Sequence, residues 1–228
     1  MNEVLGFDLD DTLYPEADFV FSGFKTVDAW VLDRFGVEGF GKHARNEFEA
    51  GRRGRIFNSV MTKMGLPYSK KLIDEMVGVY RDHYPNILLY PDARWALKHF
   101  FDRVPLGLIS DGYLNTQENK LEALGIRQRF AKIVLTDSLG RDFWKPSPKP
   151  YQEIERAFGP EHLFTYIADN PLKDFLGARR SGIPTVWVQR RDCEYTHLEP
   201  PTTEHEADFR IDSLTGLEGA LAKIGTAQ

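Results

Sequence analysis

The stretch that decides the fold is Val4-Leu5-Gly6-Phe7-Asp8-Leu9-Asp10-Asp11-Thr12-Leu13, in which an apolar run passes directly into three carboxylates. A short apolar run is typical of a buried parallel strand. Carboxylates this close repel one another and resist desolvation unless a cation or hydrogen-bond donors compensate them. Because open α/β sheets bind ligands at the carboxyl ends of their strands, we expect a functional site here. The alternative interpretation is a turn that the aspartates cap.

Similar short apolar runs alternate with helical segments over much of the chain. The runs at residues 4–8, 105–110, 133–136, 164–168, 184–189 and 209–211 are the predicted strands. Helices are expected over residues 114–124, from Pro171 to Gly182, and after Ser213, whose side chain can cap the first turn. This alternation predicts an α/β fold, a Rossmann-like parallel sheet with helices on both faces.

Residues 15–84 interrupt that alternation. Apolar residues recur there at intervals of three and four, first over residues 20–35 and then over 40–48, 56–64 and 72–83. Four amphipathic helices with no strand between them predict a helical bundle inserted after the first strand. The α/β core would then comprise residues 1–14 and 85–228.

The composition narrows the classes of function. The chain has 228 residues, of which 42% are hydrophobic, and a net charge of −5, so neither nucleic acid nor an anionic membrane is an expected partner. No apolar run approaches the ~20 residues of a membrane span, and the one cysteine, Cys193, cannot form an internal disulfide. We expect a cytoplasmic monomer or homodimer.

Three further polar motifs follow predicted strands or lie in their loops. They are Leu108-Ile109-Ser110-Asp111-Gly112, Lys145-Pro146-Ser147-Pro148-Lys149-Pro150-Tyr151 and Ile167-Ala168-Asp169-Asn170-Pro171-Leu172-Lys173-Asp174. With Asp8-Leu9-Asp10-Asp11-Thr12, their order resembles the haloacid dehalogenase-like hydrolase superfamily over residues 4–189. The resemblance implies that the inserted helices are the mobile cap of its C1 group. This chain departs from the family pattern at Ala168, usually glycine, at Asp111, often asparagine, and at Asp11, glycine in several members.

The residue types themselves favour hydrolysis of a phosphate ester in two displacements. A carboxylate such as Asp8 can attack phosphorus and form an aspartyl phosphate that water then cleaves. Asp10 could protonate the leaving oxygen and later activate the water. Lys145 could neutralise the nucleophile and the phosphoryl group, although a solvated loop lysine is the alternative. The predicted phosphate-binding residues are Ser110, Asp111 and Gly112, the last two through backbone amides, together with Thr12.

The excess of carboxylates predicts a hard divalent cation, Mg²⁺. The predicted ligands are Asp8, Asp10, Asp169 and Asp174. The resemblance implies direct bonds from Asp8 and Asp169, a backbone carbonyl from Asp10, and an indirect role for Asp174. The dehalogenases that this chain resembles lack an acid at the position of Asp10 and need no metal, so the presence of Asp10 favours a phosphatase.

Specificity is harder to predict. Arg52 and Arg53, in a basic segment, and Tyr113 are candidates for substrate contact. A solvated basic face paired with Glu47 and Glu49 is the alternative interpretation of the arginines. The expected substrate is a sugar phosphate, a sugar-acid phosphate or a nucleotide. A phosphomutase of the β-phosphoglucomutase type and a binding protein without turnover are the competing hypotheses.

Overall fold

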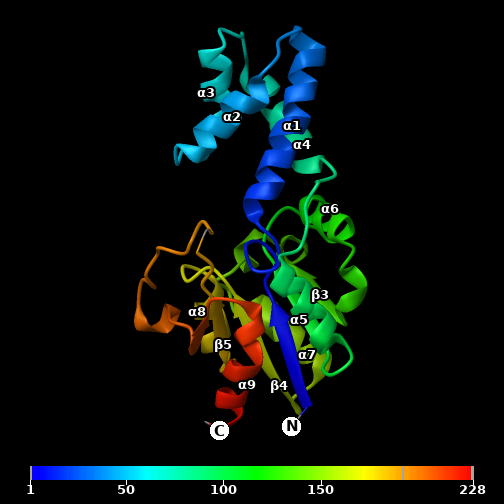
Figure 1. Cartoon of the computed structure of the whole chain (residues 1–228), viewed down its shortest axis with the longest axis vertical. Helices are drawn as coiled ribbons and strands as arrows, with labels where there is room; N and C mark the ends of the chain where they lie inside the picture. Colours follow the sequence, from blue (N-terminus) through cyan, green and yellow to red (C-terminus); the bar gives the residue numbers. More distant parts are fainter. Residues whose placement is uncertain (1, 192, 227–228) are drawn as a thin grey trace.

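The sheet places the end of its first strand at the centre of the molecule (Figure 1). The computed structural model describes residues 2–191 and 193–226. Its strands are β1 (Asn2–Phe7), β2 (Leu106–Ser110), β3 (Lys132–Leu135), β4 (His162–Ala168), β5 (Thr185–Val188) and β6 (Phe209–Ile211). They form one sheet in the order β3-β2-β1-β4-β5-β6, with every pairing parallel. The predicted parallel sheet is therefore confirmed.

Helices cover both faces of the sheet, as predicted. On one face α5 (Pro91–Phe101), α6 (Leu114–Leu124) and α9 (Leu217–Thr226) pack on the sheet through one hydrophobic cluster. On the other face α7 (Lys149–Phe158) and α8 (Asp174–Arg180) pack through a second cluster. Leu5 and Phe7 of β1 belong to the first cluster and Val4 to the second, because successive side chains of a strand point to opposite faces. Short 3₁₀ turns lie at Arg127–Arg129, Thr136–Leu139, Arg141–Phe143, Thr203–His205 and Leu214–Gly216.

Two predicted helix starts are wrong. The helix expected from Pro171 begins only at Asp174, because residues 171–173 form a turn held by two side chains. In that turn Asn170 Oδ1 accepts from the amide of Leu172, and Asp174 Oδ2 accepts from the amide of Asn170, each at 2.9 Å. The last helix starts at Leu217, after a 3₁₀ turn that Ser213 caps. The predictions also omitted α5 and α7.

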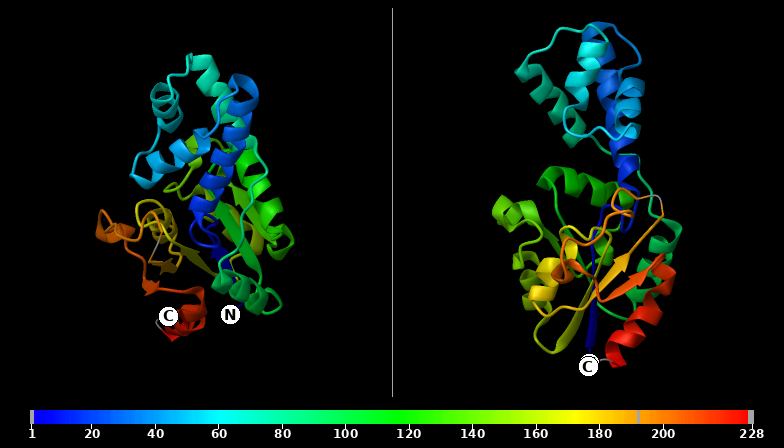
Figure 2. Two further views of the ribbon diagram at one scale, coloured as in Figure 1. Left: turned by 45° about the horizontal axis from the view of Figure 1, so that its top comes forward. Right: turned by 90° about the vertical axis from the view of Figure 1, so that its left-hand side faces the viewer.

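Four helices between β1 and α5 form a separate layer. They are α1 (Glu16–Phe35), α2 (Phe40–Glu49), α3 (Ile56–Lys63) and α4 (Lys70–Asp82), and each contributes to a third hydrophobic cluster, which includes Val27, Phe40, Met61 and Met76. Figures 1 and 2 show this bundle beyond the edge of the sheet toward which the strands run. The predicted domain limits at residues 15 and 84 stay a prediction; residues 1, 192, 227 and 228 of the predicted core lie outside the described residues. No helix of the described part combines the length and hydropathy that a membrane crossing needs.

Candidate active site

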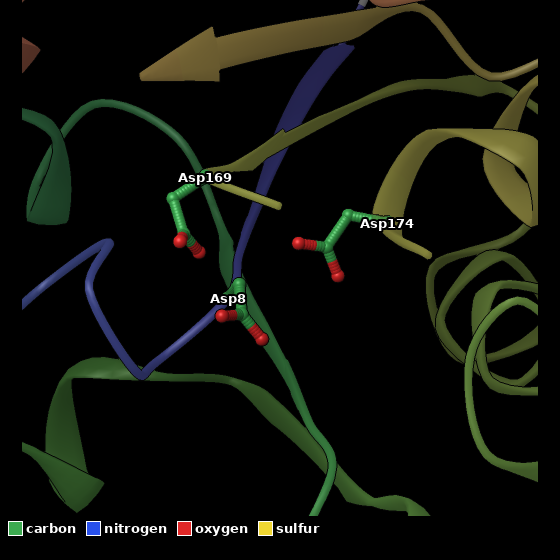
Figure 3. Close-up of side chains that lie close together, drawn as sticks. All are labelled: Asp8, Asp169 and Asp174. Carbon is green, nitrogen blue, oxygen red and sulfur yellow. The ribbon is translucent and has the colours of Figure 1, made fainter. Parts of the chain in front are cut away.

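Three buried carboxylates meet at the carboxyl edge of the sheet (Figure 3). Asp8 follows β1, Asp169 follows β4, and Asp174 opens α8; one carboxylate oxygen from each lies within 4.8 Å of the others. The register accounts for the first two, since Phe7 lies beside Ile167 and the amide of Asp8 donates to the carbonyl of Ile167 at 2.9 Å. Parallel neighbours end at the same edge of a sheet, which brings the residues after them together.

Lys145 lies among these carboxylates and is itself fully buried. Its Nζ is 2.5 Å from Asp8 Oδ1 and 2.6 Å from Asp174 Oδ1, and it donates to the Tyr166 hydroxyl at 3.1 Å. Burial alone would lower the pKa of Lys145, but the charges of Asp174 and Asp8 raise it well above its usual range. Lys145 is therefore a permanent cation within the cluster.

Two lysines, Lys145 and Lys173, act on the three carboxylates, so negative charge stays in excess. Burial raises the pKa of Asp8 to about 7, against the opposing effect of Lys145. Burial, with the charges of Asp174 and Asp8, raises the pKa of Asp169 well above its usual range. Thr12 donates to Asp169 Oδ1 at 3.2 Å, but Asp169 Oδ2 has no hydrogen-bond partner among the described residues. Buried oxygen donors short of positive charge fit a hard divalent cation.

Asp10 lines the same cavity as Asp8 and Asp169, and its carboxylate contacts side chains of α6. Its carboxylate accepts from Lys120 Nζ at 2.7 Å, from the Tyr14 hydroxyl, and at 3.4 Å from the amide of Gln117. Burial would raise the pKa of Asp10, but Lys120 and the Tyr14 hydrogen bond outweigh it and leave the pKa below its ordinary value. The carboxylate of Asp10 is thus held in its ionised form beside the cluster.

The predicted phosphate-binding residues surround the same edge. Ser110 ends β2, and its buried Oγ has no partner in the part of the chain that the structure describes. The carboxylate of Asp111 instead accepts from Thr136 Oγ1 at 2.7 Å and from the backbone amide of Lys145 at 3.2 Å, so Asp111 positions the loop of Lys145. Gly112 has a φ of 140°, and a Cβ there would lie 2.0 Å from Gln117 Nε2. A side chain at residue 112 would therefore displace the side chain of Gln117, and this backbone conformation itself favours glycine.

A cavity of about 430 Å³ lies over these groups. Asp8, Asp10, Asp169 and Lys145 line it, and Tyr113 does as well. The Tyr113 ring packs between two guanidinium groups, that of Arg81 at 3.8 Å and that of Arg141 at 4.6 Å from the ring centroid.

The two arginine candidates lie elsewhere. Arg52 pairs with the buried carboxylate of Glu47 and lines neither this cavity nor the larger one beside it, so pairing with Glu47, the alternative interpretation, describes Arg52. Arg53 lines the larger cavity, where its guanidinium is 2.6 Å from Glu194 Oε2.

Sequence reasoning missed several functional groups. Gln117 and Lys120 are three residues apart on the buried face of α6, and both contact Asp10. Polar residues at buried helix positions were the signal that could have identified them. Lys173 lines the same cavity, and its Nζ lies 3.4 Å from Asp111 Oδ2. Its position directly before the predicted ligand Asp174 was the available signal for this lysine.

Comparison with known proteins agrees with this geometry. The glyceraldehyde 3-phosphate phosphatase of Methanopyrus kandleri is 28% identical over 217 residues, which cover 90% of this chain and 91% of that protein. The phosphoserine phosphatase of Thermus thermophilus is 31% identical over 166 residues, 71% of this chain and 62% of that protein. The solved structure of the HAD-hydrolase YfnB from Bacillus subtilis superimposes with a TM-score of 0.67 at 17% identity, covering 96% of this chain and 98% of that one, and supports the fold. Residues 5–188 match the family described as haloacid dehalogenase-like hydrolase, and the chain belongs to that family.

Proposed function

We propose that this protein is a Mg²⁺-dependent phosphatase that transfers the phosphoryl group of a small phosphate ester to Asp8 and then to water. The observation that carries this proposal is the contact of Asp8 with Lys145, inside a cluster of three buried carboxylates whose negative charge this lysine does not balance. Family membership and the phosphatases among the relatives confirm the prediction of a phosphate-ester hydrolase.

The residues present fit a bound Mg²⁺. Asp8 and Asp169 would hold the ion, with the backbone carbonyl of Asp10, while Asp174 pairs with Lys145 and accepts from the amide of Asn170. When bound, Mg²⁺ supplies positive charge that lowers the repulsion between the carboxylates and the incoming phosphate. Asp169 Oδ2, which has no hydrogen-bond partner within residues 2–191 and 193–226, supports a ligand role for this residue.

The chain's own residues account for both displacements. A carboxylate oxygen of Asp8 attacks phosphorus, and the ester oxygen leaves with a proton from Asp10. Asp10 takes up this proton from solvent when the negative charge of the bound phosphate raises its pKa. In the second step Asp10 takes a proton from water, which attacks phosphorus and frees phosphate and Asp8. Lys120 and Tyr14 favour the ionised form of Asp10 that this second step requires. Lys145 and the Ser110 hydroxyl stabilise charge on the transferring group.

We also infer that residues 15–84 act as a cap. The cavity over the carboxylates is lined by Glu16 and Phe19 of α1 and by Tyr80 and Arg81 of α4, which lie opposite the core residues. A cover of this kind excludes water from the first displacement and contacts the leaving group. It favours a small metabolite over a phosphorylated protein.

The proposal predicts a specific loss on substitution of the nucleophile. Asp8→Asn should lower phosphate release from a panel of phosphorylated metabolites by roughly 10³-fold or more. Its melting temperature should stay within a few degrees of wild type, because Lys145 retains Asp174 as a partner at 2.6 Å. The matched control is Asp102→Asn, an exposed carboxylate that precedes β2 and so lies at the opposite edge of the sheet, which should keep full activity.

The assay is run with Mg²⁺ and with EDTA, after the purified variants have been checked for contaminating phosphatase. Activity of Asp8→Asn equal to that of the control would refute the nucleophile assignment. Activity that survives EDTA would refute the metal requirement. Activation by a sugar bisphosphate, with isomerised sugar phosphate and no free phosphate as product, would identify a phosphomutase instead.

A further inference from the structure

A second cavity, of about 730 Å³, adjoins the one over the carboxylates. Glu16, Tyr80, Arg81 and Tyr195 line both, so the two cavities meet along these four residues. The larger one is bounded by α1, α4 and the loop between α2 and α3, and on the core side by residues 193–195. It lies where the part of a substrate remote from the phosphate would extend.

One wall of this cavity is apolar and largely aromatic. We call the wall formed by Val20, Phe24, Phe48, Ile56, Phe57 and Tyr80 the aromatic chamber. Ring centroids lie 6.3 Å apart for Phe24 and Phe48, 6.1 Å for Phe24 and Phe57, and 5.8 Å for Phe57 and Tyr80, with the rings tilted edge to face. Such a wall offers ring faces and edges to a flat ligand.

The charged groups of this cavity disfavour a second phosphate on the substrate. Arg53 is engaged with Glu194 at 2.6 and 3.1 Å, and its guanidinium lies 3.8 Å from the Phe48 ring centroid. Asp11 and Glu16 add two more carboxylates to the lining. Arg81 and Glu16, at the junction of the cavities, can instead bind hydroxyl groups between the phosphate and an apolar end.

We propose that the aromatic chamber binds the leaving group of the substrate and that this leaving group carries a planar aromatic or heteroaromatic ring, as in a nucleoside 5′-monophosphate. The inference rests on the proposed phosphatase function. An apolar pocket of several hundred Å³ binds by burying most of its ligand's surface. A three-carbon polar alcohol would leave the rings of the chamber in contact with water, whereas a planar ring covers them.

Two matched pairs of esters test the proposal with the full chain and Mg²⁺. Uridine 5′-monophosphate is compared with ribose 5-phosphate, in which a hydroxyl replaces the base, and 3-phenylpropyl phosphate with propyl phosphate, which lacks the phenyl ring. We expect kcat/KM to be about tenfold or more higher for the ring-bearing member, equivalent to about 1.4 kcal/mol. A preference for the ring-bearing ester in the first pair alone shows that the chamber requires a nucleobase. A preference in both pairs shows that it accepts any planar ring.

Equal or lower kcat/KM for the ring-bearing members of both pairs would overturn the inference and leave the phosphatase proposal intact. A kcat/KM for glyceraldehyde 3-phosphate above that of both ring-bearing esters would do the same. If no ester is hydrolysed, the phosphatase proposal fails and the chamber is tested by binding instead. The affinities of the four esters are then measured with Asp8→Asn in the presence of Mg²⁺. Tighter binding of ring-bearing esters there supports the chamber even without turnover, and equal binding refutes it.

Substitutions in the bundle locate the preference. Phe48→Leu removes a ring of the chamber and should reduce the ring preference at least about threefold. The matched control is Phe21→Leu, since the Phe21 ring packs 5.5 Å from that of Phe48 but does not line the chamber, and the preference should be retained. Val77 lines the same cavity from α4, so Val77→Phe narrows the space beside the chamber and should also reduce the ring preference; it provides a second variant if Phe48→Leu fails to fold. If the wild type and all three variants show the same ring preference, the ring of the substrate does not bind in the aromatic chamber.

Discussion

Asp169 is the least compensated carboxylate of the buried cluster. It lies within reach of Asp8 and Asp174, and among the described residues only the Thr12 hydroxyl donates to it. This imbalance disfavours the metal-free protein and creates the affinity for a cation. Binding of an ion to the folded state alone raises stability by about 2.7 kcal/mol at a concentration 100 times the dissociation constant.

Removal of this carboxylate should therefore have opposite effects with and without metal. We expect Asp169→Asn to raise the melting temperature in EDTA, because it relieves repulsion, and to abolish the further rise that Mg²⁺ gives to the wild type. Differential scanning fluorimetry with and without Mg²⁺ measures both effects. A Mg²⁺-induced rise in Asp169→Asn as large as that of the wild type would exclude Asp169 as a ligand.

Lys120 is a second residue whose effect can be isolated. Its Nζ contacts Asp10 and lies 4.4 Å from the Phe19 ring centroid, so Lys120→Met removes the charge while keeping an apolar stem on the ring. We expect kcat/KM to fall roughly 10- to 100-fold, because Asp10 loses the partner that orients it. Lys149→Met removes a half-exposed lysine paired with Glu153 and should leave kcat/KM unchanged. The assignment fails if both variants retain wild-type kcat/KM.

The motif residues of the site could be predicted because each follows a strand or lies in the loop after it. Asp8 and Asp169 follow from the parallel sheet alone. The partners of Asp10 could not be predicted in this way, because Lys120 lies 110 residues away and no local pattern encodes that contact. The same holds for Arg53 and Glu194, 141 residues apart, whose pairing depends on how two loops meet in space.

Among the elements, α8 is closely packed against the loop that carries Lys145. A Cβ on Gly177 would lie 2.5 Å from the carbonyl oxygen of Pro146 and 2.8 Å from that of Ser147. In an open helix, alanine in place of glycine adds about 1 kcal/mol of stability. Here the backbone contacts should reverse the sign, since the helix or the loop must move.

We therefore expect Gly177→Ala to destabilise the protein by about 1–3 kcal/mol in urea unfolding and to lower activity, because α8 carries Asp174. Gly78→Ala is the control: no atom lies within 4 Å of a Cβ at this position in the middle of α4, and we expect a gain of up to about 1 kcal/mol. The packing argument is refuted if Gly177→Ala is as stable as Gly78→Ala.

Glu47 links α2 to α3 through ion pairs and a hydrogen bond. Its buried carboxylate accepts from Arg52, Lys63 and Ser59, and the hydrogen bonds from Arg52 and Lys63 lower its pKa from 4.5 to about 2. A group whose pKa is depressed by folding stabilises the fold above its unfolded pKa, and that contribution is lost as pH falls through the folded pKa. The loss should therefore extend from about pH 4.5 down to about pH 2.

Glu47→Gln should lower the melting temperature at pH 7 and flatten its dependence on pH over this window. Glu49→Gln, which alters a half-exposed carboxylate on the same helix paired with Arg45, should follow the wild-type curve. Circular dichroism melts between pH 2 and 7 distinguish these outcomes. Parallel curves for wild type and Glu47→Gln would show that this ion pair does not stabilise the folded bundle.

Elements whose apolar residues recur at a regular interval could be predicted from the sequence. Element boundaries that depend on tertiary contacts could not. The apolar stripes of α1 to α4 and the short apolar runs of the strands correspond to observed elements. The start of α8 could not be predicted from Pro171, because a turn held by Asn170 and Asp174 occupies the residues that a helix would have used.

At the scale of the whole molecule, the chain leaves the core for the bundle directly after the site and returns before α5. Beyond these two crossings, the ion pair of Arg53 with Glu194 joins the bundle to the segment that packs on Asp11. Glu16, the first residue of α1, donates its amide to Asp11 Oδ1 at 2.8 Å. The start of the bundle, the loop after β1 and residues 193–195 thus meet at one place.

The central position of β1 has a consequence for the order in which a newly made chain matures. Residues 16–82 can pack on one another as soon as they leave the ribosome, because α1 to α4 are contiguous in sequence. β1 is the first strand synthesised, yet its partner β4 ends only at Ala168. The surroundings of Asp8 are therefore incomplete until some 160 later residues have emerged, although the helical bundle that follows Asp8 in sequence can fold earlier. Catalytic competence therefore comes late in synthesis, after Asp174 at the start of α8 has also emerged.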